Sequence, residues 1–141
     1  YFCNMLSKTA KYGLKAIMYM VQHKEASQKI FKVDELSKEL GIPKYFLSKV
    51  LLDLTRKDLL SSMKGPNGGF YFKDKQLDHK PSEILFALEG DAFLKTCMME
   101  LKPCDIHKVC PFHGSYSHFK ENLIAGLNCK TFRQFSENGH L

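Results

Sequence analysis

Four residues late in the chain have the types and the spacing to hold a metal ion or an iron–sulfur cluster. Cys97, Cys104, Cys110 and His113 form the pattern Cys-x6-Cys-x5-Cys-x2-His. Thiolates are soft ligands that suit iron–sulfur clusters, zinc and copper(I), and an imidazole is a common fourth partner. The spacers are wider than those of the first ligand pair of a zinc knuckle, so this loop can wrap a cluster. The pattern therefore predicts metal or cluster binding.

Other interpretations of these cysteines stay open. Zinc fingers of the Cys-Cys-Cys-His kind space their ligands similarly, although they usually place three residues before the histidine. The thiols can also act as a redox switch, or simply share a loop. Cys129 stands apart from the pattern in a predicted apolar context, so we interpret it as a packed thiol and not as a ligand.

Positive charge is concentrated in the first half of the chain. The formal net charge is +6, and residues 1–64 hold twelve Lys or Arg against six Asp or Glu, whereas residues 65–141 hold nine of each. A nucleic-acid phosphate backbone favours such asymmetry, because each bound cation releases condensed counterions. A generic solubilising surface would also be basic. The 44% hydrophobic and 26% charged content is ordinary for a globular protein.

The pattern of residues 7–57 predicts the helices that would position a nucleic-acid contact. Ser7 is placed to cap a helix, and the pattern of residues 33–40 predicts a second. Gly41 suits the left-handed position after that helix, and Pro43 suits the start of a third. Two helices joined by a short turn, the second with a basic outer face, form a helix-turn-helix.

A small β-hairpin should follow, and further helices after it. The run Gly65-Pro66-Asn67-Gly68-Gly69 demands a turn, and Phe70-Tyr71-Phe72 favours a strand, so we predict a wing over residues 59–72. Helices are predicted over 82–89, from about residue 115, and at Thr131-x-x-Gln134, which has capping-box spacing. The expected fold is mainly α with a small β-hairpin wing. We expect residues 5–80 to form a winged helix-turn-helix domain, and residues 81–141 to add a post-wing helix, a cysteine-rich sensing loop and a long C-terminal helix.

Candidate DNA contacts follow from this arrangement. Lys49 can donate to guanine acceptors, and Ser48 can pair with several bases, so both are expected in the major groove beside Lys44. Phosphate clamps set register without reading sequence, and Lys8, Lys11 and Arg56 are placed for that role. At the wing tip, small residues allow close approach to a minor groove or to neighbouring phosphates. The wing-tip candidates are Lys64, Gly65, Asn67 and Gly68.

Several segments together resemble the Rrf family of bacterial winged-helix transcription regulators. Residues 7–16 resemble the family's opening helix, residues 42–51 its recognition helix, and residues 64–70 its wing. Residues 88–90 resemble the end of its post-wing helix, and the likeness extends from about Met5 to Phe135. This resemblance implies a homodimer that binds double-stranded DNA at a roughly palindromic operator, with Tyr45 on the recognition helix. It further implies pairing through the long C-terminal helix, whose apolar stripe is Phe119, Leu123, Ile124 and Leu127.

The resemblance also implies an iron–sulfur cluster, 2Fe-2S or 4Fe-4S, on Cys97, Cys104 and Cys110. His113 matches the fourth-ligand position of the IscR-like branch. The NsrR-like branch can use an acidic residue where this chain has Lys11, which favours His113. Two features depart from the IscR-like pattern: the first spacer is one residue longer, and Ser48 and Lys49 replace Glu and Gln. Operator specificity is therefore not transferred to this chain.

The expected function is that of a sequence-specific transcription regulator, a repressor, whose DNA affinity is set by the cluster. The alternative is a winged-helix regulator without a cluster, acting as a thiol redox switch or as a zinc-stabilised protein. We expect no enzymatic activity, because no nucleophile–base pair is evident and the glycines of 65–69 do not open a helix. No run of eighteen apolar residues is present, so we expect no membrane span and a cytoplasmic location.

Overall fold

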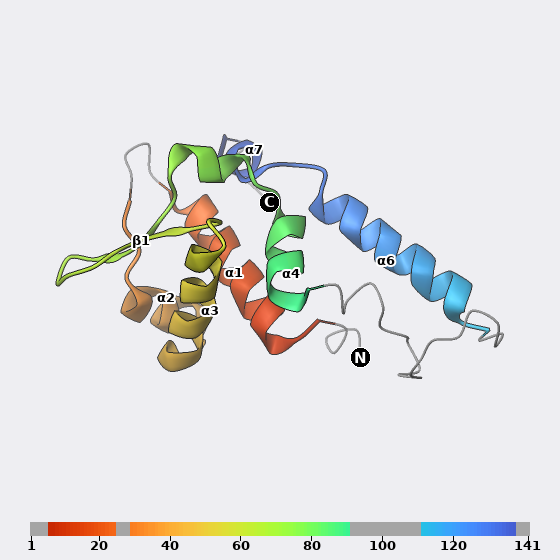
Figure 1. Ribbon diagram of the computed structural model, residues 1–141, viewed down its shortest axis with the longest axis horizontal. Helices are drawn as coiled ribbons and strands as arrows, with labels where there is room; N and C mark the ends of the chain where they lie inside the picture. Colours follow the sequence, from red (N-terminus) through yellow and green to blue (C-terminus); the bar gives the residue numbers. More distant parts are fainter. Residues whose placement is uncertain (1–5, 25–28, 91–110, 138–141) are drawn as a thin grey trace.

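The computed structural model describes residues 6–24, 29–90 and 111–137. In these residues the fold is mainly helical with one antiparallel two-stranded sheet, as predicted (Figure 1). The element order is α1 (Lys8–Gln22), α2 (Val33–Leu40), α3 (Lys44–Arg56), β1 (Ser61–Met63), β2 (Gly69–Tyr71), the 3₁₀ helix η2 (Asp74–Asp78), α4 (Pro81–Glu89), α6 (His113–Leu127) and α7 (Phe132–Glu137). No helix in these residues combines the length and the apolar character that a bilayer crossing needs.

The predicted helix-turn-helix is confirmed in α2 and α3. Gly41 follows α2 in the left-handed conformation, with φ of 65°, where a side chain would be strained. The hydroxyl of Ser37 donates to the carbonyl oxygen of Ile42 at 2.6 Å, and Pro43 precedes the first turn of α3. These contacts hold the turn between the two helices and so fix the direction in which α3 leaves it.

The wing is a short hairpin anchored to the segment before α2. Ser61, Ser62 and Met63 pair with Tyr71, Phe70 and Gly69. Phe31 adds an isolated bridge, since its amide donates to the Phe70 carbonyl at 2.7 Å and its carbonyl accepts from the Phe70 amide at 2.8 Å. Gly69 is required by this pairing, because a Cβ there would lie 2.4 Å from the Phe31 carbonyl oxygen.

A continuous apolar core joins the winged helix to the C-terminal part of the chain. It contains buried side chains of α1, α3, the hairpin and α4, together with Phe132 of α7. Phe132 is fully buried, its ring centroid lies 6.1 Å from that of Phe72, and its amide donates to the His79 carbonyl at 2.9 Å. The described residues of 6–80 and those of 81–137 therefore share one core.

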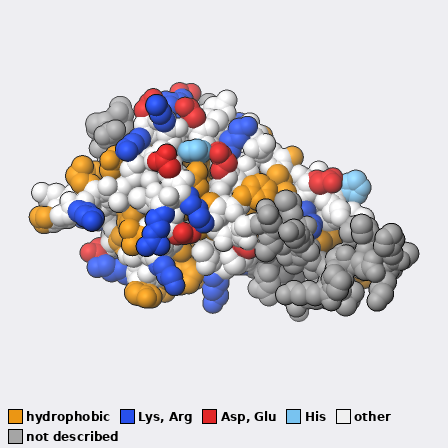
Figure 2. All heavy atoms as spheres, viewed as in Figure 1, with side chains coloured by type: hydrophobic (Ala, Val, Ile, Leu, Met, Phe, Trp, Pro, Cys, Tyr) orange, Lys and Arg blue, Asp and Glu red, His pale blue; other side chains and the backbone are white. Residues whose placement is uncertain are grey.

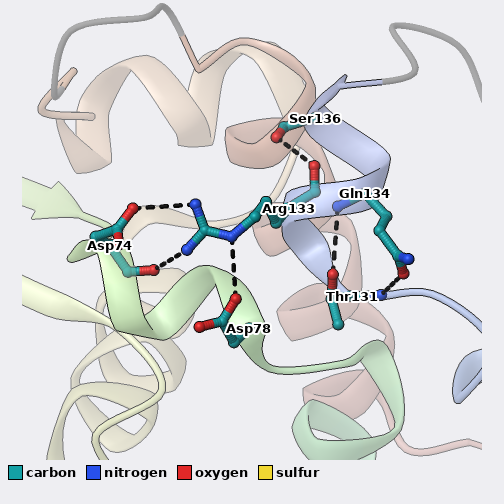
Figure 3. Close-up of polar contacts among 6 residues, drawn as sticks. All are labelled: Asp74, Asp78, Thr131, Arg133, Gln134 and Ser136. Atoms are coloured by element: carbon teal, nitrogen blue, oxygen red, sulfur yellow. Dashed lines mark hydrogen bonds and ion pairs between the residues drawn. The ribbon is translucent and has the colours of Figure 1, made fainter.

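Arg133 fastens α7 to η2 beside the base of the wing (Figure 3). Its guanidinium donates to the carboxylates of Asp74 and Asp78, each at 3.0 Å, and to the Asp74 carbonyl at 2.8 Å. The hydrogen bonds to Asp74 and then to Asp78 raise the pKa of Arg133 above its usual high value.

A buried polar residue, Gln76, joins η2 to the residues just after α3. Gln76 accepts the Ser61 hydroxyl at 3.0 Å and the Lys73 amide at 2.9 Å. Its amide nitrogen donates to the backbone carbonyl of Asp58 at 3.3 Å, where Asp58 holds a positive φ of 59°. Gln76 is 3% exposed, so satisfying its polar atoms avoids the cost of burying them unpaired.

Candidate DNA-binding surface

The outer face of α3 carries one continuous ridge of exposed side chains. Leu47, Val50, Leu51 and Leu54 are buried on the inner face. The spacing of three to four residues places a second set on the opposite side. We call this set the recognition ridge: Tyr45, Lys49, Leu52 and Arg56, all of them exposed. Tyr45 is 83% exposed and Leu52 45% exposed, so the ridge alternates apolar and cationic side chains.

Two further predicted groove residues flank the ridge. Lys44 is exposed at the first turn of α3, and its ammonium lies 2.6 Å from a carboxylate oxygen of Asp34 on α2. Both side chains are more than half exposed, so this ion pair is weak and the lysine can exchange it for a phosphate. Ser48 is half-buried beside the ridge.

The start of α1 lies beside the start of α3. Tyr12 contacts Phe46 edge to face, with ring centroids 5.3 Å apart. This contact holds the first turns of α1 near α3, where Lys8 is exposed and Lys11 half-buried. Figure 2 shows that Lys and Arg side chains gather over the half of the molecule that contains α3 and the wing.

The wing tip presents small and exposed residues. Lys64, Gly65 and Asn67 are exposed, and Gly68 is half-buried. Gly65 has φ of 108°, and its carbonyl oxygen accepts the Gly68 amide at 2.9 Å, which closes the turn. A Cβ on Gly68 would lie 2.1 Å from the Met63 carbonyl oxygen, so glycine is required there. The tip is therefore thin, and Lys64 is its charged side chain.

Leu52 is a ridge residue that sequence reasoning missed. The apolar residues on the inner face of α3 already account for the helix, so the apolar character of Leu52 gave no reason to expect it on the outer face. The signal was its position seven residues after Tyr45 and three after Lys49, which puts all three on one face.

The residues predicted to bind metal lie mostly beyond the part described. Cys97, Cys104 and Cys110 fall in 91–110, and His113 begins α6 with its side chain outside the description. Residues 6–24, 29–90 and 111–137 by themselves contain no group of three potential metal ligands. The interpretation of Cys129 as a packed thiol is wrong, because the residue is exposed and its sulfur lies 3.0 Å from the Gly126 carbonyl oxygen. Cys129 comes two residues after the end of α6, so it is not part of the apolar face of that helix.

The predicted dimer stripe lies along α6, which extends away from the winged helix in Figure 1. Leu123, Ile124 and Leu127 are half-buried against a small cluster formed by Ala10 and Leu85. Phe119, nearer the start of the helix, is 39% exposed. Contacts within one chain thus cover part of the stripe and leave its N-terminal end more open.

Two similar bacterial proteins are named as HTH-type transcriptional regulators. The chain is 29% identical over 126 residues to a candidate HTH-type transcriptional regulator of Aquifex aeolicus, covering 84% of this chain and 82% of that protein. It is 28% identical over 104 residues to an rrf2-like candidate of the same type from Rhodobacter capsulatus, covering 72% and 69%.

Solved structures share the fold at low sequence identity. IscR of T. potens superposes with a TM-score of 0.68 at 19% identity, over 96% of this chain and 88% of that one. CymR, the global cysteine regulator of B. subtilis, gives 0.68 at 14% identity, over 94% and 96%. The oxidized form of Staphylococcus aureus CymR gives 0.65 at 17% identity, over 94% and 95%.

A family model described as Rrf2, iron-dependent transcriptional regulator, matches residues 6–138, which is nearly the whole chain. The matched range spans the residues of the helix-turn-helix, of the wing and of the segment that contains the cysteines. The chain belongs to the Rrf2 family of transcriptional regulators.

Proposed function

We propose that this regulator binds a specific double-stranded DNA operator, roughly palindromic, as a homodimer and represses transcription there. One observation carries the proposal: the recognition ridge lies exposed on α3, whose first turn contacts the basic start of α1. A helix of this width fits the major groove of B-DNA, and a two-fold operator matches a two-fold protein.

Each candidate residue has a role set by its position. Lys49 points outward from the middle of the ridge, where it can donate to guanine, and Ser48 lies beside it. Lys8, Lys11 and Arg56 neutralise phosphates on both sides of the groove, and Lys44 joins them when it leaves Asp34. Lys64 accompanies Gly65, Asn67 and Gly68 to the adjacent minor groove or its phosphates.

The cysteine pattern supports a cluster on this chain by its donor chemistry. Three thiolates and one imidazole suit an iron–sulfur cluster, and they suit zinc as the alternative. When bound, the cluster supplies a centre sensitive to oxidants, nitric oxide or iron supply. Cys97, Cys104, Cys110 and His113 would hold it between the end of α4 and the start of α6.

The last turn of α4 connects that segment to the DNA-binding surface. The Ala87 carbonyl accepts a hydrogen bond from Lys57, the residue after α3, and Glu89 accepts the Ser7 amide at 2.6 Å. A change in the residues after Gly90 would therefore reach both α3 and the start of α1. We infer that cluster state shifts operator affinity through this turn, because a ligand acts only through its differential affinity for two states.

The test begins with anaerobic purification of the wild type, Cys104→Ala and Cys129→Ala. We expect visible absorbance with matched iron and sulfide in the wild type and in the Cys129 variant, and their loss in the Cys104 variant. Operator binding is then measured for loaded and cluster-free protein over a salt series. Equal affinities across that series would contradict cluster control.

A thiol switch is the second candidate, and the likeness to a CymR structure solved in an oxidized form favours it. In that case the protein stays colourless after reconstitution, and an oxidant changes operator affinity reversibly. Alkylation mapping would then place a disulfide among Cys97, Cys104 and Cys110. Stoichiometric zinc without visible absorbance would identify the zinc-stabilised alternative.

A further inference from the structure

We propose that Tyr45 and Leu52 read thymine, by packing against C5-methyl groups of the operator on either side of Lys49. The inference rests on the proposed function and names the bases that the recognition ridge selects. It places the apolar side chains of this ridge against the floor of the DNA major groove.

Exposure and position single out these two residues. Leu47, Val50, Leu51 and Leu54 turn into the core, whereas Leu52 is 45% exposed on the opposite face. Tyr45 is 83% exposed in the first turn of α3, and Leu52 lies two turns further along the same face. Each therefore keeps apolar surface in water until a partner covers it.

Charge complementarity decides the partner. Lys49 and Arg56 alternate with Tyr45 and Leu52 along one ridge, so whatever covers the apolar side chains also meets two cations. Duplex DNA meets that requirement, because its phosphates line the groove while the thymine methyl is the apolar group displayed on the groove floor.

Helix geometry gives the spacing of the bases. Tyr45 and Leu52 are seven residues apart, which is about 10 Å along a helix at roughly 1.5 Å per residue. Base pairs repeat about every 3.4 Å along the duplex axis, and a helix in the groove lies oblique to that axis, so the two methyl contacts should lie at most about three base-pair steps apart. Each half-site should accordingly contain two thymines bracketing a guanine that Lys49 contacts.

The experiment starts from duplexes that the 141-residue protein, loaded and cluster-free, selects from a random-sequence pool. Each thymine of the selected site is then replaced by deoxyuridine, which removes only the methyl group, and binding is measured by fluorescence anisotropy. We expect about a fourfold loss of affinity at two thymines per half-site and none at the others. Leu52→Ala should abolish the loss at one of these positions and Tyr45→Ala at the other. Leu52→Met, which keeps apolar surface, should preserve it.

The outcomes separate this inference from the proposed function. If no sequence is enriched, DNA readout itself fails and the inference fails with it. If an operator is selected but all deoxyuridine duplexes bind like the parent, only the thymine inference is overturned. Methyl sensitivity that survives both alanine variants overturns it as well. A change in oligomer mass for Leu52→Ala, without a change in methyl sensitivity, would assign the ridge to a protein contact instead.

Discussion

Gly68 shows how a single absent side chain shapes the wing. Its conformational freedom is not the reason for glycine here, because a Cβ would lie 2.1 Å from the Met63 carbonyl oxygen and 2.9 Å from the Lys64 carbonyl carbon. Backbone atoms cannot yield as a flexible side chain can. We expect Gly68→Ala to lower the free energy of unfolding by about 1–3 kcal/mol, measured by urea denaturation.

The matched control for Gly68→Ala is Gly126→Ala. A Cβ at Gly126 meets nothing within 4 Å, and the residue lies in α6. Alanine is the better helix former, so this change should raise stability by about 0.5–1 kcal/mol. Equal effects of the two substitutions would show that hairpin crowding does not constrain Gly68.

Also at the residue scale, Lys11 and Lys49 should fail in different ways when neutralised. If Lys11 contacts a phosphate as proposed, Lys11→Gln should lower affinity alike on all sequences. The slope of log K against log salt should decrease by about 0.9 per contact, hence about twice that in a dimer. Lys49→Gln should instead relax the preference for one base pair of the operator.

Lys130→Gln serves as the control for both lysine variants. This lysine follows α6, where its ammonium lies 5.9 Å from the centroid of the Phe135 ring, away from α3. Binding isotherms at several salt concentrations, on the operator and on scrambled duplexes, provide the measurement. An unchanged salt slope for Lys11→Gln would remove that residue from the phosphate contacts.

At the scale of elements, the helices follow from local sequence and the docking of α7 does not. Ser7 caps α1 by accepting the Ala10 amide at 3.1 Å, and α2 spans Val33–Leu40, both as predicted. The predicted Thr131–Gln134 capping box is also present, with bonds of 2.9 and 3.3 Å. These signals lie within a few residues of one another, so periodicity and caps reveal them.

Contacts between distant elements left no such local signal. Arg133 meets Asp74 across 59 positions, and nothing in the pattern of either segment names the other. The Phe31–Phe70 bridge and the burial of Phe132 are equally long-range. Except for Leu52, the ridge residues could be predicted, because helical spacing locates the outer face of α3 once its buried face is known.

The docking of α7 predicts a large stability effect at Phe132. Its side chain is fully buried against Phe72, so Phe132→Ala removes a core ring and leaves a cavity. We expect a loss of about 3–5 kcal/mol in the free energy of unfolding, measured in urea. Phe135→Ala, three residues on and only half-buried, should cost clearly less. Similar costs for both variants would mean that α7 does not dock in solution as described.

At the scale of the whole molecule, the apolar stripe of α6 is the proposed dimer interface. Leu123, Ile124 and Leu127 are half-buried within the chain, and Phe119 is 39% exposed. If two chains pair through this stripe, Phe119→Asp should shift the proposed dimer toward monomer, since a buried unpaired carboxylate is costly. Sedimentation equilibrium measures the mass, and Asn122→Asp adds the same charge off the stripe as a control. A dimer that is unchanged in Phe119→Asp would place the interface elsewhere.

The proposed coupling of the cysteine segment to DNA binding would involve the entire molecule. Glu89 lies in the last turn of α4, just before residues 91–110 in the sequence, and accepts the Ser7 amide at the basic start of α1. If this bond transmits the state of that segment, removing the acceptor should leave operator binding in place but bring loaded and cluster-free affinities closer together. We therefore expect Glu89→Ala to reduce the ratio of the two affinities severalfold.

Glu89→Gln separates the hydrogen bond from the charge, because its amide oxygen can still accept from Ser7. Paired titrations of loaded and cluster-free protein against one operator give the ratio for each variant. Preservation of the ratio in Glu89→Gln, with its loss in Glu89→Ala, would assign transmission to the bond itself. An identical ratio in wild type and Glu89→Ala would exclude this contact and leave Lys57 and the Ala87 carbonyl as the connection between α4 and the recognition helix.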